Sequence, residues 1–179
     1  MISLEAALDK ILGLVRPLEM ETVPLEAAAG RILRGDLTAL VDLPPFDNSA
    51  MDGYAVRAAD TTGATPASPA VLRLTGAVPA GAAGGATVEA GACARIYTGS
   101  PVPPGADAVV MQEDTTLSAD DAGVVRVCDR VKPFENLRLR GEDVRRGEVL
   151  ARSGVRLNAA RLALLAACGQ ASVPVGRVP

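Results

Sequence analysis

Residues 44–57 read PPFDNSAMDGYAVR, and the pattern of the chain changes at this stretch. Before it, the apolar residues of 4–15 (LEAALDKILGLV) recur at helical spacing, and Ser3 precedes them as a candidate cap. From 46 to 131, short runs of β-forming residues alternate with Gly- and Pro-rich segments, which is typical of a small all-β unit. The stretch therefore opens an inserted β domain.

Helical spacing returns near the end of the chain, where Asn158 is a candidate cap and Gly169 ends the pattern. A short helix is expected over 25–29, and the last stretch, 171–179, reads as a strand broken by Pro174. The strands expected in the middle of the chain lie in YAVR, VLRLTGAV, ARIY, DAVVMQED and VVRVCDRV.

The simplest architecture is an α+β fold of two domains. Both chain ends, residues 1–43 and 138–179, form a small helix-containing domain, and residues 44–137 form an irregular all-β domain inserted into it. Because the final strand has neither a partner nor a cap, we expect the 179 residues to be a fragment of a longer protein that continues into another α/β domain.

Composition excludes several classes of function. The 18 basic and 21 acidic residues give a net charge of −3, so no positive field gathers the phosphates of a nucleic acid. The chain contains no histidine, which excludes histidine acid–base catalysis, Ser-His-Asp triads, Cys-His nucleophiles and His-ligated metals.

The cysteines and the N-terminus indicate a reducing compartment. Cys93, Cys128 and Cys168 are widely spaced, lie in apolar runs and form no C-x-x-C motif, so we expect buried small side chains and neither a zinc cluster nor a disulfide framework. The first residues, MISLEAALDK, show no basic region followed by an apolar one, and no apolar run approaches the ~20 residues that span a bilayer. We therefore expect a cytoplasmic protein without a membrane partner.

Two polar stretches are candidates for chemistry. In the first, Asp47 and Asp52 flank an Asn-Ser pair; they are either turn residues that bind local amides or carboxylates on a rigid turn that can hold a hard cation such as magnesium. In the second, residues 95–107 (RIYTGSPVPPGAD), a Thr-Gly-Ser sequence forms either an anion-binding concavity or a proline-stiffened loop.

A third polar stretch, FENLRLRGEDV, covers residues 134–144. Arg138 and Arg140 alternate, so in a strand they share one face, and two guanidinium groups suit a phosphate or another oxyanion. The alternative is a solvated strand whose arginines pair with Glu142 and Asp143.

Together the three stretches resemble the molybdopterin molybdenumtransferase family, called MoeA in bacteria and the E domain in gephyrin-like proteins. The resemblance is carried by PPFDNSAMDGYAVR (44–57), RIYTGSPVPPGADAVVMQED (95–114) and NLRLRGEDV (136–144), in this order along the chain. PFDNSAMDGYA is a long and unusual string, which makes the match specific.

The resemblance implies an enzyme of molybdenum cofactor biosynthesis. It inserts molybdenum from molybdate into adenylylated molybdopterin, releases AMP and depends on a divalent metal, here Mg²⁺ bridging substrate phosphate or molybdate. Family members are elongated homodimers of several domains, and this chain resembles the first two. The cleft of the family dimer lies between the β domain of one subunit and the third domain of the other.

The resemblance also assigns site residues. Asp52, Thr98 and Asp143 match family positions expected to be catalytic, and Arg138 lines the same cleft. Asp52 is the expected metal ligand, and the sequence does not rank it against Asp143. The expected substrate-binding residues are Ser49, Ser100, Arg138 and Arg140.

Two further functions stay open from the sequence. One is a non-catalytic dimerisation and cleft-forming module that binds anions and is inactive as an isolated fragment. The other is a free-standing anion-binding β scaffold.

Overall fold

The computed structural model describes residues 2–81, 87–117 and 123–178, and the chain forms two compact units. Met1–Asp42 with Val144–Pro179 make the first unit, and Leu43–Asp143 make the second. The chain leaves the second unit after Asp143, later than the expected 137/138, because Leu137–Arg138 pair with Asn48–Ser49 and the Asp143 amide donates to the Leu43 carbonyl.

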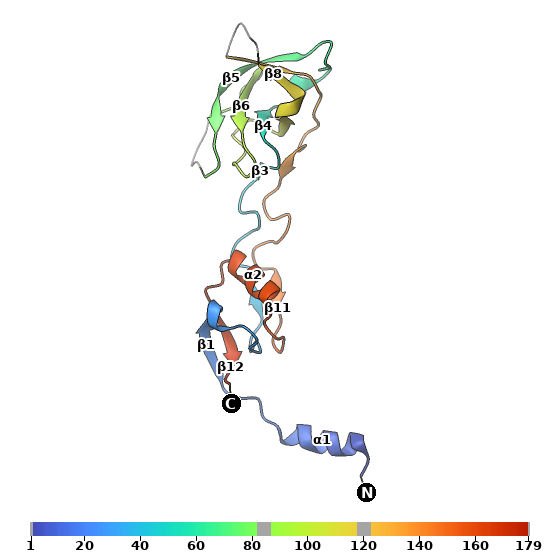
Figure 1. Ribbon diagram of the computed structural model, residues 1–179, viewed down its shortest axis with the longest axis vertical. Coiled ribbons are helices and arrows are strands. Elements are labelled where there is room, and N and C mark those ends of the chain that lie inside the picture. Colours follow the sequence, from blue (N-terminus) through green and yellow to red (C-terminus); the bar gives the residue numbers. More distant parts are fainter. Residues whose placement is uncertain (1, 82–86, 118–122, 179) are drawn as a thin grey trace. The chain divides into compact units, whose positions relative to one another are not determined.

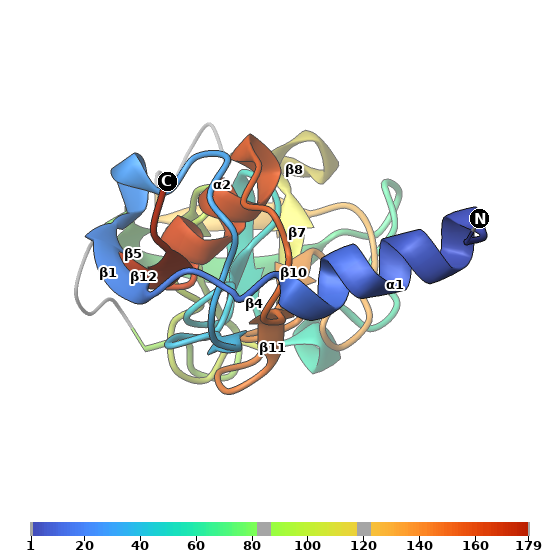
Figure 2. The same ribbon diagram turned by 90° about the horizontal axis from the view of Figure 1, so that it is seen from below.

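The first unit combines both ends of the chain. Strands β1 and β12 pair in antiparallel fashion and lie side by side in both views (Figure 1, Figure 2), so the expectation that the final strand has no partner is wrong. Strands β2 and β11 form a second antiparallel pair. The elements are α1 (Leu4–Leu14), β1 (Met20–Pro24), the 3-10 turn η1 (Leu25–Ala27), β2 (Leu37–Thr38), β11 (Val149–Ala151), α2 (Ala159–Ala167) and β12 (Ser172–Gly176).

The two helices of the described chain begin where the sequence predicts. The Ser3 hydroxyl accepts a bond from the Ala6 amide at 3.2 Å, and the Asn158 side chain accepts one from the Arg161 amide at 2.9 Å. Helix α2 packs Leu165 against the core of the first unit, whereas α1 has no buried residue. The expected helix over 25–29 is wrong in kind, because only the 3-10 turn η1 forms there.

Strand β12 runs through Pro174 instead of breaking there. The register pairs Pro174 with Thr22 of β1, and the Pro174 carbonyl accepts a bond from the Arg34 amide at 2.9 Å. The nitrogen and carbonyl of one residue face the same side of an antiparallel strand. The backbone N–H that proline lacks would therefore point toward Arg34 and away from β1. The pairing of β12 with β1 loses no hydrogen bond at Pro174.

The second unit is built on a six-stranded mixed sheet with strand order β7-β4-β6-β5-β9-β8. Strands β4, β5, β6 and β8 of this sheet are labelled in Figure 1. Strands β5 and β6 are parallel, and the other neighbours are antiparallel. The strands of this sheet are β4 (Gly53–Val56), β5 (Ala70–Val78), β6 (Ala92–Ile96), β7 (Ala108–Met111), β8 (Thr115–Leu117) and β9 (Val124–Val127). The α+β class is confirmed, and each of the five expected runs contains a strand.

Side chains of the sheet alternate between two cores. Tyr54, Val56 and Cys93 belong to one core, whereas Ala55, Ala94 and their neighbours belong to the other. Short elements complete the unit: β3 (Asn48–Ser49), β10 (Leu137–Arg138) and the 3-10 turns η2 (Ala58–Thr61) and η3 (Gln112–Asp114). Two expected separators, 79–86 and 118–123, lie largely outside the described residues.

The cysteines behave as the sequence predicts at two of three positions. Cys93 and Cys168 are buried, and burial raises the pKa of the Cys93 thiol to about 12. Cys128 is half-buried, and all three thiols are free. Within the described ranges, no helix has the length and apolarity needed to cross a membrane.

Gly53 at the start of β4 is a test of how tightly the sheet packs. A Cβ at this position would lie 1.9 Å from the Val110 carbonyl oxygen, which is backbone of the neighbouring strand. We expect Gly53→Ala to lower the free energy of unfolding by about 2–3 kcal/mol, since β4 and β7 must separate to admit the methyl group. Chemical denaturation measures this loss.

The matched control is Gly13→Ala in α1, where nothing lies within 4 Å of the added Cβ. Alanine is the better helix former, so this variant should be as stable as the wild type or gain up to about 1 kcal/mol. Equal stability of both variants would show that β4 and β7 yield easily at Gly53.

Candidate active-site surface

Strand β3 brings the three polar stretches together. The Ser49 amide donates to the Ser100 carbonyl at 3.0 Å, and the Ser49 carbonyl accepts from the Gly99 amide at 2.9 Å. On the following residue, the Ala50 amide donates to the Asn136 carbonyl at 2.9 Å. Residues far apart in the sequence therefore share one backbone hydrogen-bond network within the second unit.

Asp52 is held by Thr98. The Thr98 amide and the Thr98 hydroxyl both donate to Asp52 Oδ1, at 2.8 and 2.9 Å. These two bonds, the amide bond first, lower the pKa of the Asp52 carboxyl, and the positive charge of Arg95 acts in the same direction. The side chain is exposed and ionised at neutral pH, and its Oδ2 accepts no hydrogen bond from any described residue.

Arg95 is a neighbour of Asp52 that the sequence analysis missed. Its guanidinium carbon lies over the rings of Tyr54 and Tyr97, 5.1 and 5.2 Å from their centroids. Its Nη2 donates to Gln112 Oε1 at 2.6 Å, and the Gln112 amide donates to the Asp52 carbonyl at 3.0 Å. The alternation of Arg95 and Tyr97 in RIY was the available signal, because alternate residues of a strand share a face.

A cavity of about 480 Å³ forms part of this surface. A second cavity, of about 490 Å³, lies in the first unit between Gly30 and Arg156 and is not part of it. The cavity of about 480 Å³ opens beside Arg95 and is lined by Tyr54, Arg95, Gln112, Thr115 and Leu117. Together with Asp52 and Thr98 it offers a carboxylate, a hydroxyl, a guanidinium and an aromatic wall, which suits an anionic ligand with a bound cation.

Arg138 is paired with carboxylates, as the alternative interpretation of the sequence predicts. Its Nε donates to Glu142 Oε1 at 2.5 Å, and its Nη2 donates to Asp143 Oδ2 at 2.6 Å. The bond from Arg138 lowers the pKa of Glu142. The Arg140 amide is bonded to Asp47 Oδ1 at 2.7 Å, so the carboxylate of Asp47 braces this loop. The roles of Arg138, Arg140 and Asp143 in the reaction stay predictions.

The two expected substrate-binding serines point inward. The Ser49 hydroxyl donates to the Met51 carbonyl at 2.5 Å and accepts from the Met51 amide at 3.2 Å. Ser100 is fully buried, and its hydroxyl has no hydrogen-bond partner among the described residues. Their placement favours bracing of the loops, while a contact with substrate stays a prediction.

The carboxylates of this surface suit a magnesium ion that is also bound by the substrate and by water. Among the described residues, no three cysteine or acidic side chains are grouped so that they could hold a metal. Magnesium often takes one or two carboxylates and completes its shell with water and substrate phosphates. The free Oδ2 of Asp52 fits that mode of binding.

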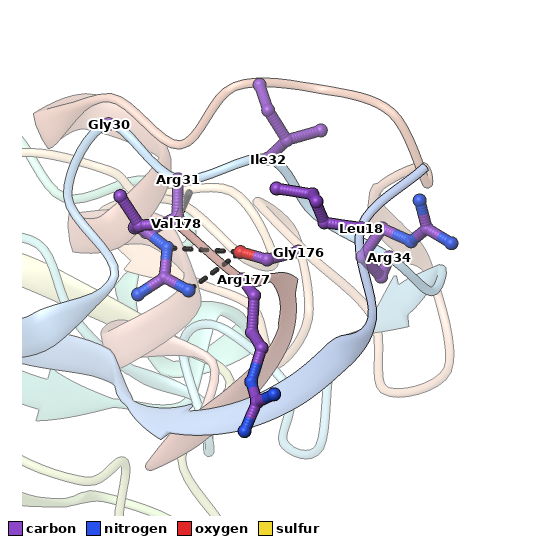
Figure 3. A pocket seen from close by; sticks show the side chains of 8 residues that line it. All are labelled: Leu18, Gly30, Arg31, Ile32, Arg34, Gly176, Arg177 and Val178. Carbon is purple, nitrogen blue, oxygen red and sulfur yellow. Dashed lines mark hydrogen bonds between the residues drawn. The ribbon is translucent and has the colours of Figure 1, made fainter. Parts of the chain in front are cut away.

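A different cavity, of about 320 Å³, lies in the first unit and contains none of the expected site residues. Figure 3 shows the Arg31 guanidinium turned toward the Gly176 carbonyl, with hydrogen bonds of 3.2 and 2.7 Å. Arg31 also pairs with Glu21. Its positive charge is therefore already engaged within the fold.

Comparison with known proteins decides the family. A family model described as "MoeA N-terminal region (domain I and II)" matches residues 2–169. The chain belongs to the MoeA N-terminal family. The resemblance of its three polar stretches to molybdopterin molybdenumtransferases is thereby confirmed.

Curated relatives of this MoeA N-terminal region are longer proteins. The chain is 46% identical over 154 residues to molybdopterin molybdenumtransferase 2 of Mycobacterium tuberculosis, and the match covers 86% of this chain and 37% of the relative. It is 39% identical over 174 residues to molybdopterin molybdenumtransferase of Haemophilus influenzae, covering 97% of this chain and 41% of the relative. The chain thus spans about two-fifths of these relatives.

Solved structures give the same family. A crystal structure of the molybdopterin biosynthesis MoeA protein of Pyrococcus horikoshii matches with a TM-score of 0.91 and 37% identity. The match covers 100% of this chain and 47% of that one. The fold described above is therefore the fold of a MoeA N-terminal region.

The Thr98 hydroxyl offers a direct test of the Asp52 environment in this MoeA N-terminal region. We expect Thr98→Ala to raise the pKa of Asp52 toward its ordinary value without reaching it, because the amide of residue 98 still donates. With a folded-state pKa below the unfolded one, the Asp52–Thr98 interaction stabilises the fold above the ordinary aspartate pKa and is lost as pH falls through the lowered value. NMR titration of the Asp52 carboxyl carbon measures the shift.

Thr116→Ala serves as the control, since Thr116 is an exposed threonine of β8 in the same unit. Its substitution should leave the Asp52 titration unchanged. An Asp52 pKa that is the same in wild type and Thr98→Ala would mean that the hydroxyl does not support the carboxylate.

Proposed function

We propose that the chain is the N-terminal part of an enzyme that inserts molybdenum from molybdate into adenylylated molybdopterin and releases AMP. The observation that carries the proposal is the pairing of Asp52 with Thr98 beside the junction of all three polar stretches at β3. The names of the relatives support molybdopterin as the substrate class.

Asp52 binds the divalent cation in this proposal, and Thr98 orients the carboxylate. Both Thr98 donors point at Oδ1, so they fix the side chain in one rotamer and leave Oδ2 toward the ligand. Magnesium, when bound, supplies positive charge against a phosphate or molybdate oxygen. The lowered pKa of Asp52 means that the carboxylate also stays charged under more acidic conditions than an ordinary aspartate does.

Arg138 and Asp143 form the second polar group of the proposed surface. Their ion pair and the bond from Arg138 to Glu142 hold the RGED loop in one conformation. Asp143 then acts on the substrate as a fixed carboxylate, and Arg138 acts through a positive charge that its partners partly neutralise. A cytoplasmic location accords with the three free thiols and remains part of the proposal.

A second candidate is the non-catalytic module that dimerises and shapes a cleft. The exposed apolar face of α1 favours a homodimer in either case, because Leu4, Leu8 and Ile11 are exposed by 80%, 51% and 60%. We propose that a second copy of the chain covers this face.

The enzyme proposal is tested by Asp52→Asn in a full-length enzyme, built by joining this chain to the C-terminal part of a curated relative. The substitution keeps the size and the hydrogen-bonding capacity but removes the charge. We expect molybdenum transfer to fall by at least about a hundredfold, with the melting temperature nearly unchanged, because a hard cation needs the carboxylate. Transfer is measured at several magnesium concentrations.

Asp36→Asn is the matched control, since Asp36 is a carboxylate of the first unit paired with Arg152. The 179-residue chain alone is the blank, because the proposed reaction needs groups from parts of the enzyme that this chain does not contain. If Asp52→Asn melts many degrees lower while its folded fraction transfers molybdenum normally, Asp52 is a turn residue and the proposal fails.

The homodimer is tested by light scattering at tens of micromolar protein. We expect the mass of a dimer for the wild type and of a monomer for Ile11→Glu, because a carboxylate in a buried apolar contact is strongly unfavourable. Lys10→Gln changes the charge of α1 by the same amount on a polar residue and should remain dimeric. A monomeric wild type would refute the proposal.

A further inference from the structure

Arg95 and Arg138 of the second unit differ in what their side chains bind. The guanidinium expected to hold an anion, that of Arg138, is engaged by the carboxylates of Glu142 and Asp143. Arg95 instead donates to a neutral oxygen, Gln112 Oε1. Its positive charge is therefore not cancelled by an ion pair among the described residues.

The surroundings of Arg95 are those of a preorganised binding group. Tyr54, which is only 6% exposed, and Tyr97 cover the guanidinium. Stacking on rings leaves the edge of a guanidinium available for hydrogen bonds in its plane. Nη2 uses part of that edge for Gln112, and neither Nε nor Nη1 is bonded to a described residue.

The same group is tied to Asp52 through the backbone. Gln112 fixes the Arg95 side chain with its amide oxygen and fixes the Asp52 carbonyl with its backbone N–H, at 2.6 and 3.0 Å. The Arg95 guanidinium and the Asp52 backbone therefore share Gln112 as a partner, and the cavity of about 480 Å³ opens beside Arg95. That volume accommodates a phosphate or diphosphate group.

We propose that Arg95 binds a phosphate group of the substrate in the cavity that it lines with Tyr54 and Gln112. The proposal rests on the function proposed above, which supplies a substrate with phosphate groups and a cation at Asp52. Glu113 lies close to Gln112, whose Nε2 donates to it at 3.3 Å, so the site carries acidic groups as well. A cation on Asp52 offsets their repulsion, and the phosphate then lies between two positive charges.

The test uses the magnesium complex of inorganic pyrophosphate as the probe and calorimetry as the measurement. We expect saturable binding to the wild-type chain and binding at least about tenfold weaker to Arg95→Gln, because a guanidinium–phosphate contact is charge-assisted. Arg73→Gln removes the same charge from β5, where the register with Ala92 places Arg73 on the opposite face of the sheet from Arg95. This control should bind as the wild type does.

A second measurement needs no substitution that could disturb folding. In the wild type, the Nε–H signal of Arg95 should shift saturably as the probe is added, while that of Arg73 should not. Equal binding by Arg95→Gln and wild type, equal weakening by Arg73→Gln, or an unmoved Arg95 signal would each overturn the proposal. These outcomes leave molybdenum transfer by the full-length enzyme untouched, so they separate a failure at Arg95 from a failure of the proposed function.

Discussion

The second unit depends on a strand of two residues that has partners on both sides. Asn48–Ser49 cannot form a stable strand alone, because so few residues fix too few hydrogen bonds. Ser49 bonds to Gly99 and Ser100 on one side, and the pairing with Leu137–Arg138 completes the other. The short strand persists because two distant segments of the chain supply its backbone partners.

That junction brings the polar residues near one another, and long-range side-chain bonds, such as those of Asp52 with Thr98 and of Asp47 with the Arg140 amide, add to it. Asp52 lies three residues after Ser49 of β3. Thr98 lies next to Gly99, whose amide donates to the Ser49 carbonyl. The chain reaches β10 through Phe134 and Asn136, both with positive φ, at 67° and 58°. Such a conformation costs roughly 1–2 kcal/mol for a residue with a side chain, so neighbouring bonds such as Asn136 to the Val109 carbonyl must stabilise it.

Local patterns in the sequence predicted both α-helices of the described residues and a strand in each of five runs, but neither the short strands such as β3 and β10 nor the pairing between strands. The caps at Ser3 and Asn158 depend on neighbours three residues away, and both were predictable. The stacking of Arg95 on Tyr54 depends on β4 pairing with β6, a choice between strands far apart in the chain. Likewise, the sequence offered two partners for Arg138, a carboxylate or an external anion, and could not choose between them.

Arg95 and Arg138 of the proposed surface are therefore suited to different roles. A guanidinium that already holds two carboxylates gains little from a further anion, since the new bond must replace existing ones. Such a group is better suited to fixing a loop, and Arg138 does so for Glu142 and Asp143. A guanidinium stacked on rings and bonded to an amide keeps its charge while losing its freedom. Arg95 thus has the low ordering cost that anion recognition needs, whereas Arg138 holds Asp143 in place through an ion pair.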